Sequence, residues 1–164
     1  MYIRKDQIYF IIGIMVLLMA IFIIYSITNG NSLNNDEEEV IKLVENFGST
    51  LKKVPLLAPR DALIQAIEEN YSPYVTDELM QSWNAHPRRA PGRTTSSPWP
   101  DRIEVTEVKR LSEDEYSVIG RIVEVTSTGA EGGGAAALRP VELFVKKIEN
   151  VWLIDEITTG NYEN

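Results

Sequence analysis

Residues 140–159 read PVELFVKKIENVWLIDEITT, two apolar runs on either side of the pair Glu149-Asn150. Valine, isoleucine and aromatic residues in runs of this length favour strands, and a two-residue interruption favours a tight hairpin. Two earlier runs rich in Val and Ile, at residues 103–108 and 115–126, flank a predicted turn at residues 111–115. The second half of the chain therefore predicts an antiparallel sheet of about four strands.

The last two predicted strands are apolar on both faces. Val141, Leu143 and Val145 alternate onto one face, while Phe144 makes the opposite face partly apolar. This pattern predicts a sheet that is covered on two sides or curled into a pocket.

The first half of the chain predicts three helices. Apolar residues recur at helical spacing from Val40 to Val54, behind a cap at Asn35 or Asp36 and before Pro55. Two more helices are predicted at residues 61–71 and 76–83, and the third ends with Trp83 facing inward. Residues 86–102 are predicted to be irregular, and the glycine-rich residues 126–138 to form a flexible hairpin loop. Helices followed by a meander indicate an α+β domain, with three helices packed on a curved antiparallel sheet.

A membrane anchor is predicted near the start of the chain. The run from Ile8 to Ile27 contains no Lys, Arg, Asp, Glu or His, and a helix of about 20 such residues spans the roughly 30 Å hydrocarbon core of a bilayer. The sequence thus predicts a cytoplasmic tail at residues 1–7, a transmembrane helix at 8–28, a spacer at 29–35 and a domain at 36–164.

The charges that flank the run predict its orientation. Arg4 and Lys5 precede it, and positive flanks stay in the cytoplasm, so the domain is expected outside the cytoplasmic membrane of a single-pass protein. A cleaved signal peptide is the alternative, but its apolar region spans about 7–15 residues and ends in small residues. The present run is longer, and Ser26-Ile27-Thr28 matches such a cleavage site poorly.

Composition limits the chemistry of the domain. The chain has 16 basic and 24 acidic residues, and leaving out Arg4, Lys5 and Asp6 gives 14 and 23, a net charge of −9. A surface with that balance repels nucleic acid, which is therefore not an expected partner. The chain has no cysteine and one histidine, so neither a zinc site of the usual kinds nor any cofactor is predicted.

The order of elements and the end of the chain resemble a known superfamily. Three helices, a meander and a last strand reading Glu149-Asn-Val-Trp-Leu-Ile-Asp-Glu-Ile157 are similar to the nuclear transport factor 2-like superfamily, over roughly Asp36 to Thr159. The resemblance implies a cone-shaped domain with a bent sheet wrapped around helices. Its members include isomerases, dehydratases, transport adaptors and membrane-tethered domains of bacterial envelope proteins, so the fold does not select a function. The predicted anchor makes this chain similar to the tethered members, which implies an assembly or binding role.

The segment 86–102 holds most of the candidate binding residues. Its part 92–102, GRTTSSPWPDR, places Trp99 between two prolines, where a rigid loop suits recognition of a peptide or a sugar and the Trp99-Pro100 bond is a candidate for cis. The alternative is that Trp99 plugs the open end of the cone. The candidate binding residues are Trp83, His86, Arg93, Trp99 and Arg102.

The arginines of this segment stand out in an acidic domain. Arg88, Arg89, Arg93 and Arg102 could bind phosphate, wall carboxylates or acidic groups of a partner, or could neutralise the domain's own acidic residues. His86 beside them is a conceivable pH-sensitive group and is otherwise an exposed loop residue.

No catalytic or metal-binding motif is present in the sequence. Glu124 and Asp155 are interpreted as surface acids, and no catalytic residue is assigned. The predicted function is a non-catalytic, membrane-anchored binding or assembly module with a protein partner or another ligand in the envelope. One alternative is a pocket enzyme of the ketosteroid-isomerase-like type, which needs a deep pocket with a desolvated carboxylate. A second alternative is a ligand-sensing regulator.

Overall fold

The computed structural model describes residues 15, 17–19, 35–132 and 134–162. The chain divides into two units, Met1–Glu38 and Glu39–Asn164. In the first unit, residues 15 and 17–19 are helical and exposed. Residue 35, which the sequence analysis assigned to a spacer, is also helical and exposed. The predicted tail, the spacer before residue 35 and the other residues of the predicted membrane helix lie outside the described residues. Within the described part, no helix combines the length and the apolar character that a membrane crossing requires.

The first predicted helix is confirmed over its described residues. The chain is α-helical over residues 35–50, continues as the 3-10 turn η1 (Leu51–Lys53) and becomes extended at Val54. The side chains of Val40, Val44 and Phe47, spaced three or four residues apart, are fully buried, as a helix with one apolar face requires.

The second and third predicted helices are also confirmed, as α2 (Arg60–Tyr71) and α3 (Asp77–Ala85). Thr76 caps α3, since its hydroxyl accepts a hydrogen bond from the Leu79 amide at 3.2 Å. The Thr76 amide in turn donates to the Ile154 carbonyl at 2.9 Å, which fixes the start of α3 to the last strand.

The four predicted strands form one antiparallel sheet in the order β1-β2-β3-β4. The strands are β1 (Trp99–Arg110), β2 (Glu115–Val125), β3 (Ala137–Ile148) and β4 (Val151–Thr159). Strand β1 begins earlier than the sequence predicted, and Trp99 pairs with Val125. Because β1 is an edge strand, it tolerates Pro100, which lacks the amide that a central strand would need. The α+β class and the predicted number of strands are confirmed.

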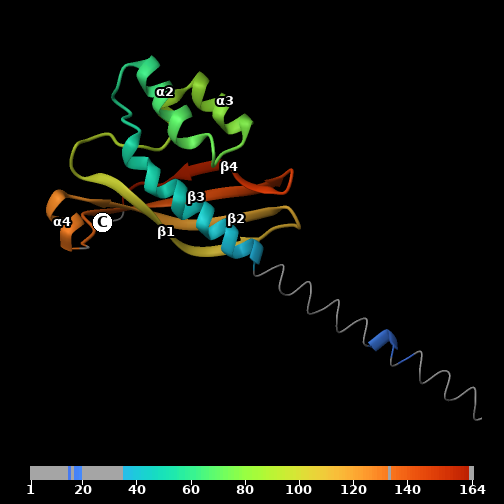
Figure 1. The fold of residues 1–164 in the computed structure, drawn as a ribbon. Coiled ribbons are helices and arrows are strands. Elements are labelled where there is room, and N and C mark those ends of the chain that lie inside the picture. Colours follow the sequence, from blue (N-terminus) through green and yellow to red (C-terminus); the bar gives the residue numbers. More distant parts are fainter. Residues whose placement is uncertain (1–14, 16, 20–34, 133, 163–164) are drawn as a thin grey trace, which may run out of the picture. The chain divides into compact units, whose positions relative to one another are not determined.

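The helical residues 39–50 cross one face of this sheet (Figure 1). Val141, Leu143 and Val145 are buried on it, as predicted. Ile119 and Val151 lie on the opposite face, where 42% and 55% of their surfaces are exposed. Val123 and Val125 lie on the same face as Ile119 along β2 and are buried. Covering on two sides, one of the two predicted arrangements, is therefore found at this end of β2, while Ile119 and Val151 remain exposed.

Close contact between the 35–50 helix and β1 depends on Gly48. A Cβ atom at this position would lie 2.5 Å from the Ile103 amide nitrogen, closer than two such atoms can approach. A side chain there would push the helix away from the sheet, so the absence of one sets the distance between the two layers.

The segment 126–138 connects the adjacent antiparallel strands β2 and β3, as the predicted hairpin loop requires, but it is not irregular throughout. The segment contains the short helix α4 (Ser127–Gly132), which contacts β2. The last two residues of the segment, 137 and 138, are the first residues of β3. The Thr126 hydroxyl accepts a hydrogen bond from the Gly129 amide at 3.2 Å. A side chain that caps the first turn compensates for the weak helix propensity of glycine.

The turn between β3 and β4 provides a test of stability. Glu149 and Asn150 have φ values of 49° and 69°, as both central residues of a type I′ turn must. Glutamate adopts such a conformation at a cost that asparagine largely avoids. We expect Glu149→Asn to raise the free energy of unfolding by about 0.5–1 kcal/mol, measured by urea denaturation of the full chain. Glu113→Asn, at an exposed turn residue without positive φ, is the control; equal effects of both changes would contradict this explanation.

Candidate functional site

The candidate site is formed by two chain segments, residues 54–63 and 85–96, that lie against each other. The Leu56 amide donates to the Arg93 carbonyl at 2.9 Å, and the Arg93 amide donates to the Val54 carbonyl at 2.8 Å. This short parallel pairing leaves no space for a side chain at Gly92, where a Cβ atom would lie 2.6 Å from the Val54 carbonyl oxygen. The backbone between the two segments is therefore held closely.

The larger of two grooves at this site is rich in basic residues. Its volume is about 440 Å³. The 3-10 turn η2 (Pro87–Arg89) buries its proline and leaves both arginines exposed. Arg60 lies at the start of α2, and its Nη2 donates to the Asn84 carbonyl at 2.9 Å, across to α3. The groove is lined by Ala58, Arg60, Leu63, Ala85, His86, Pro87, Arg88 and Arg89.

A smaller groove of about 180 Å³ is lined by the same two segments. Arg93 and three hydroxyl-bearing residues face the apolar Pro55 and Leu57, and Leu57 is 74% exposed. The Thr95 hydroxyl donates to the Pro98 carbonyl at 2.7 Å, so its oxygen remains able to accept a hydrogen bond. The hydroxyl-bearing residues are Thr94, Thr95 and Ser96.

We call the residues Leu57, Arg60, His86, Arg88, Arg89 and Arg93 the basic strip. None of the residues that line the two grooves is acidic. Among the described residues, Arg88, Arg89 and Arg93 take part in no ion pair. The strip thus carries uncompensated positive charge on a domain whose net charge is negative.

A buried tyrosine supports the backbone behind the strip. The Tyr71 hydroxyl donates to the Pro91 carbonyl at 2.7 Å, and its ring lies 4.9 Å from Phe47 and 5.5 Å from Trp83, between centroids. Burial raises the pKa of Tyr71 above its ordinary value, so the phenol keeps the proton that it donates. Tyr71 therefore connects the helical core to the segment that carries the arginines.

Tyr71→Phe tests this support. The substitution keeps the ring and leaves the buried Pro91 carbonyl without its donor, which typically costs about 1–2 kcal/mol. We expect the free energy of unfolding to fall by this amount, together with faster amide exchange at residues 90–93, measured by hydrogen exchange with mass spectrometry. Tyr74→Phe, at a half-buried tyrosine, is the control. Unchanged exchange in Tyr71→Phe would show that this hydrogen bond does not hold the segment.

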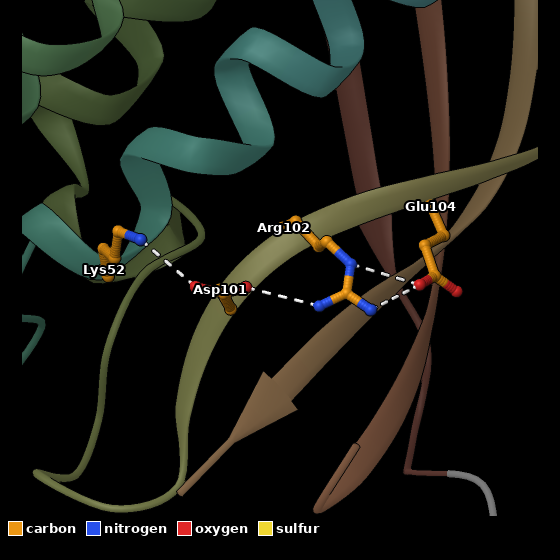
Figure 2. A network of polar contacts seen from close by, with 4 residues as sticks. All are labelled: Lys52, Asp101, Arg102 and Glu104. Atoms are coloured by element: carbon orange, nitrogen blue, oxygen red, sulfur yellow. Dashed lines mark hydrogen bonds and ion pairs between the residues drawn. The ribbon is translucent and has the colours of Figure 1, made fainter. Parts of the chain in front are cut away.

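Arg102 differs from the other predicted arginines because the domain's own carboxylates surround it (Figure 2). Its Nη2 and Nε lie 2.6 and 3.1 Å from Glu104 Oε1, and its Nη1 lies 3.3 Å from Asp101 Oδ2. Lys52 Nζ binds the other oxygen of Asp101 at 3.1 Å. The hydrogen bond to Glu104 is the main reason that the pKa of Arg102 is raised. The alternative in which this arginine neutralises acidic residues therefore fits the structure, and Arg102 lines neither groove.

The two candidate tryptophans lie apart from the grooves. Trp83 faces inward as predicted; it is 2% exposed, so its ring is not accessible to a partner. Trp99 is half-buried and opens β1 instead of lying in a loop. The expectation of a cis bond between Trp99 and Pro100 is wrong: the cis bond is Ser97-Pro98. His86 and Arg93, by contrast, each line one groove.

Leu57 and Arg60 are members of the strip that the sequence analysis did not identify. Both precede the basic segment by more than 20 residues. The packing of α2 on α3 and η2 brings Arg60 to it, and the backbone pairing of Val54 and Leu56 with Arg93 brings Leu57 to it. A leucine between two prolines, at Pro55 and Pro59, is a weak signal of an exposed turn. No pattern in the sequence indicated that this turn lies beside the arginines.

Two acidic residues interpreted as surface charges are partly or fully buried. Glu124 is 6% exposed, and its Oε1 accepts a hydrogen bond from the Tyr162 hydroxyl at 3.0 Å. Burial, followed by this hydrogen bond, raises the pKa of Tyr162. Asp155 accepts from the Thr76 hydroxyl at 3.0 Å and pairs with Lys146. The interpretation failed because the position of a residue along a strand does not reveal which distant residues contact its side chain, here Tyr162 for Glu124 and Thr76 for Asp155.

Comparisons with known proteins give no functional assignment. No protein-family model and no curated protein matches the chain. Three solved structures are similar. One is an NTF-2-like protein of unknown function from Shewanella oneidensis, which is 14% identical to this chain. The match covers 76% of this chain and 98% of that chain, with a TM-score of 0.45. A protein of unknown function from Bacteroides thetaiotaomicron has 16% identity, coverages of 80% and 97%, and a TM-score of 0.42. A DUF4783 family protein from Bacteroides uniformis has 13% identity, coverages of 77% and 97%, and a TM-score of 0.37. Similarities with identities and TM-scores this low support no inference about the activity of this chain.

Proposed function

We propose that the chain is a non-catalytic, membrane-anchored binding module that acts outside the cytoplasmic membrane, and that the basic strip is its ligand-binding face. The proposal depends most on the exposed Arg88 and Arg89, which lie in a groove without acidic residues. The contrast with Arg102, which Asp101 and Glu104 neutralise, supports an external, anionic ligand for the strip. Guanidinium groups suit this task because they bind carboxylate and phosphate through paired hydrogen bonds.

The packing of the interior also favours binding at the surface. The ring of Tyr71 contacts the rings of Phe47 and Trp83, and Leu143 and Ile154 are fully buried in the same core. An enzyme of the cone type needs an internal cavity for its substrate. A core filled by large side chains supports a role in which the ligand stays on the surface.

The membrane part of the proposal is supported by the run from Ile8 to Ile27 and its positive flank. It is tested by adding protease to intact spheroplasts that contain the full chain. We expect digestion of the domain from outside, with a membrane-bound fragment retained. Digestion only after lysis, or recovery of the chain from the culture fluid, would contradict it.

The binding part is tested by crosslinking in intact cells. A photoreactive phenylalanine derivative replaces Leu57 in the full chain, in otherwise unchanged protein and in Arg88→Glu or Arg89→Glu variants. Lys109→Glu is the matched control, since Lys109 is exposed on β1 and lines neither groove. We expect the crosslinked adducts to decrease strongly in both arginine variants and to persist in the control. Equal adducts in all variants would refute the strip as the binding face.

The second candidate function is a pocket enzyme, which the pairing of the buried Glu124 with Tyr162 favours. A carboxylate opposite a phenol is an arrangement used in proton transfer. A catalytic carboxylate must be reachable by small molecules, so carbodiimide coupling of a small amine in the folded chain tests this role. We expect Glu124 to be protected relative to the exposed Glu142; equal labelling of the two residues would favour the enzyme.

A further inference from the structure

We infer that the two grooves of the basic strip act as one site for an acidic peptide segment of a protein partner, in which carboxylates alternate with apolar side chains. This inference rests on the proposed binding function and specifies the ligand. The first argument is continuity. Leu57 lines the smaller groove and Ala58, the next residue, lines the larger one, so the two grooves adjoin along the chain and are formed by the same two segments.

Charge is the second argument. Four arginines face the grooves: Arg60, Arg88 and Arg89 the larger one, and Arg93 the smaller. They are spread along the site, whereas a single small anion could engage only a few of them. A ligand whose negative charges are spaced along a chain can pair with all of them, and opposite charge patterns guide such a ligand into one register.

The apolar part of the lining is the third argument. Leu57 is 74% exposed and lines the smaller groove together with Pro55, and Leu63, Ala85 and Pro87 line the larger groove. Phosphate or another small anion gains nothing from covering a leucine. A peptide with apolar side chains between its carboxylates would remove this surface from water, which is favourable in proportion to the area covered.

Hydroxyl groups are the fourth argument. Thr94, Thr95 and Ser96 line the smaller groove, and hydroxyls can both donate and accept hydrogen bonds. A peptide backbone presents donors and acceptors in alternation, so a wall of hydroxyls next to Arg93 suits a main chain better than it suits a purely anionic group. Charge, apolar area and mixed hydrogen bonding together match a peptide.

The experiment measures fluorescence anisotropy with the full chain in a neutral detergent. The probe is a short fluorescein-labelled peptide in which pairs of glutamates are separated by single leucines. We expect saturable binding that weakens with added salt, because screening reduces the attraction between exposed charges. Arg89→Glu and Leu57→Ser should each weaken it by about tenfold, the effect of roughly 1.4 kcal/mol, while Lys109→Glu should change it by less than about twofold.

Two further probes separate the possible ligands. A peptide of equal charge with glycine in place of leucine, and inorganic pyrophosphate, are used as competitors. Weak competition by both supports the inference. If either competes as well as the leucine-containing peptide, or if that peptide does not bind, the inference of a peptide ligand is wrong. The proposed binding function is tested separately by the crosslinking experiment. It stands if crosslinking at position 57 depends on Arg88 and Arg89, and it is wrong if crosslinking does not depend on them.

Discussion

Trp83→Ala is expected to lower the free energy of unfolding by about 3–5 kcal/mol, the usual cost of truncating a large buried aromatic side chain. Trp83 is 2% exposed, and its ring meets Tyr71 edge-on at 5.5 Å between centroids. The substitution removes that contact and leaves a cavity between the helices and the sheet. Since the stability of a domain is typically about 5–15 kcal/mol, a large part of it depends on this one side chain.

Trp99→Ala is the matched control for that experiment. Trp99 is half-buried at the start of an edge strand, so the same truncation should cost less than half as much. Guanidinium chloride denaturation of the full chain, followed by far-ultraviolet circular dichroism, measures both variants. If the two substitutions destabilise the chain equally, the position assigned to Trp83 in the core is wrong.

Gly48→Val is expected to have the next largest effect, a loss of about 3 kcal/mol in the free energy of unfolding. A Cβ atom at this position would lie 2.5 Å from the Ile103 amide nitrogen and 2.9 Å from the Ile103 Cβ. Valine has a slightly higher helix propensity than glycine, by a few tenths of a kcal/mol. The steric overlap outweighs that gain, because it moves the helix away from β1 along the contact.

Gly134→Val is the control for the crowding argument, since a Cβ atom at Gly134 would meet no atom within 4 Å. We expect its midpoint of thermal unfolding to stay close to that of the unchanged chain, while that of Gly48→Val falls by several degrees. Crowding at the helix–sheet contact would be excluded by equal midpoints for the two variants.

The parts of the fold with strong periodicity could be predicted from the sequence. The range of β4, Val151–Thr159, was predicted to the residue, and α2 within one residue of its start. The start of β1 was missed because Pro98 and Pro100 were interpreted as loop residues, although an edge strand accepts proline. Helix α4 was missed because its local sequence has no apolar period, and a cap and contact with β2 hold it instead.

The candidate site was only partly predictable, for a similar reason. An arginine-rich segment in an acidic chain was visible in the sequence, and Arg88, Arg89 and Arg93 lie in the grooves. Separating Arg102 from them required the position of Glu104 on the same strand. Adding Arg60 and Leu57 required the packing of two segments distant in sequence. Local patterns identify charged residues, and tertiary contacts decide which of those charges remain unpaired.

The backbone behind the basic strip is fixed by the Tyr71–Pro91 hydrogen bond and by the two amide–carbonyl contacts that link Val54, Leu56 and Arg93. A preorganised receptor gives up little conformational entropy when it is occupied. Most of the ordering on association then falls on the incoming segment, as in coupled folding and binding. Titration calorimetry should accordingly show an entropy penalty that shrinks when the segment is cyclised beforehand.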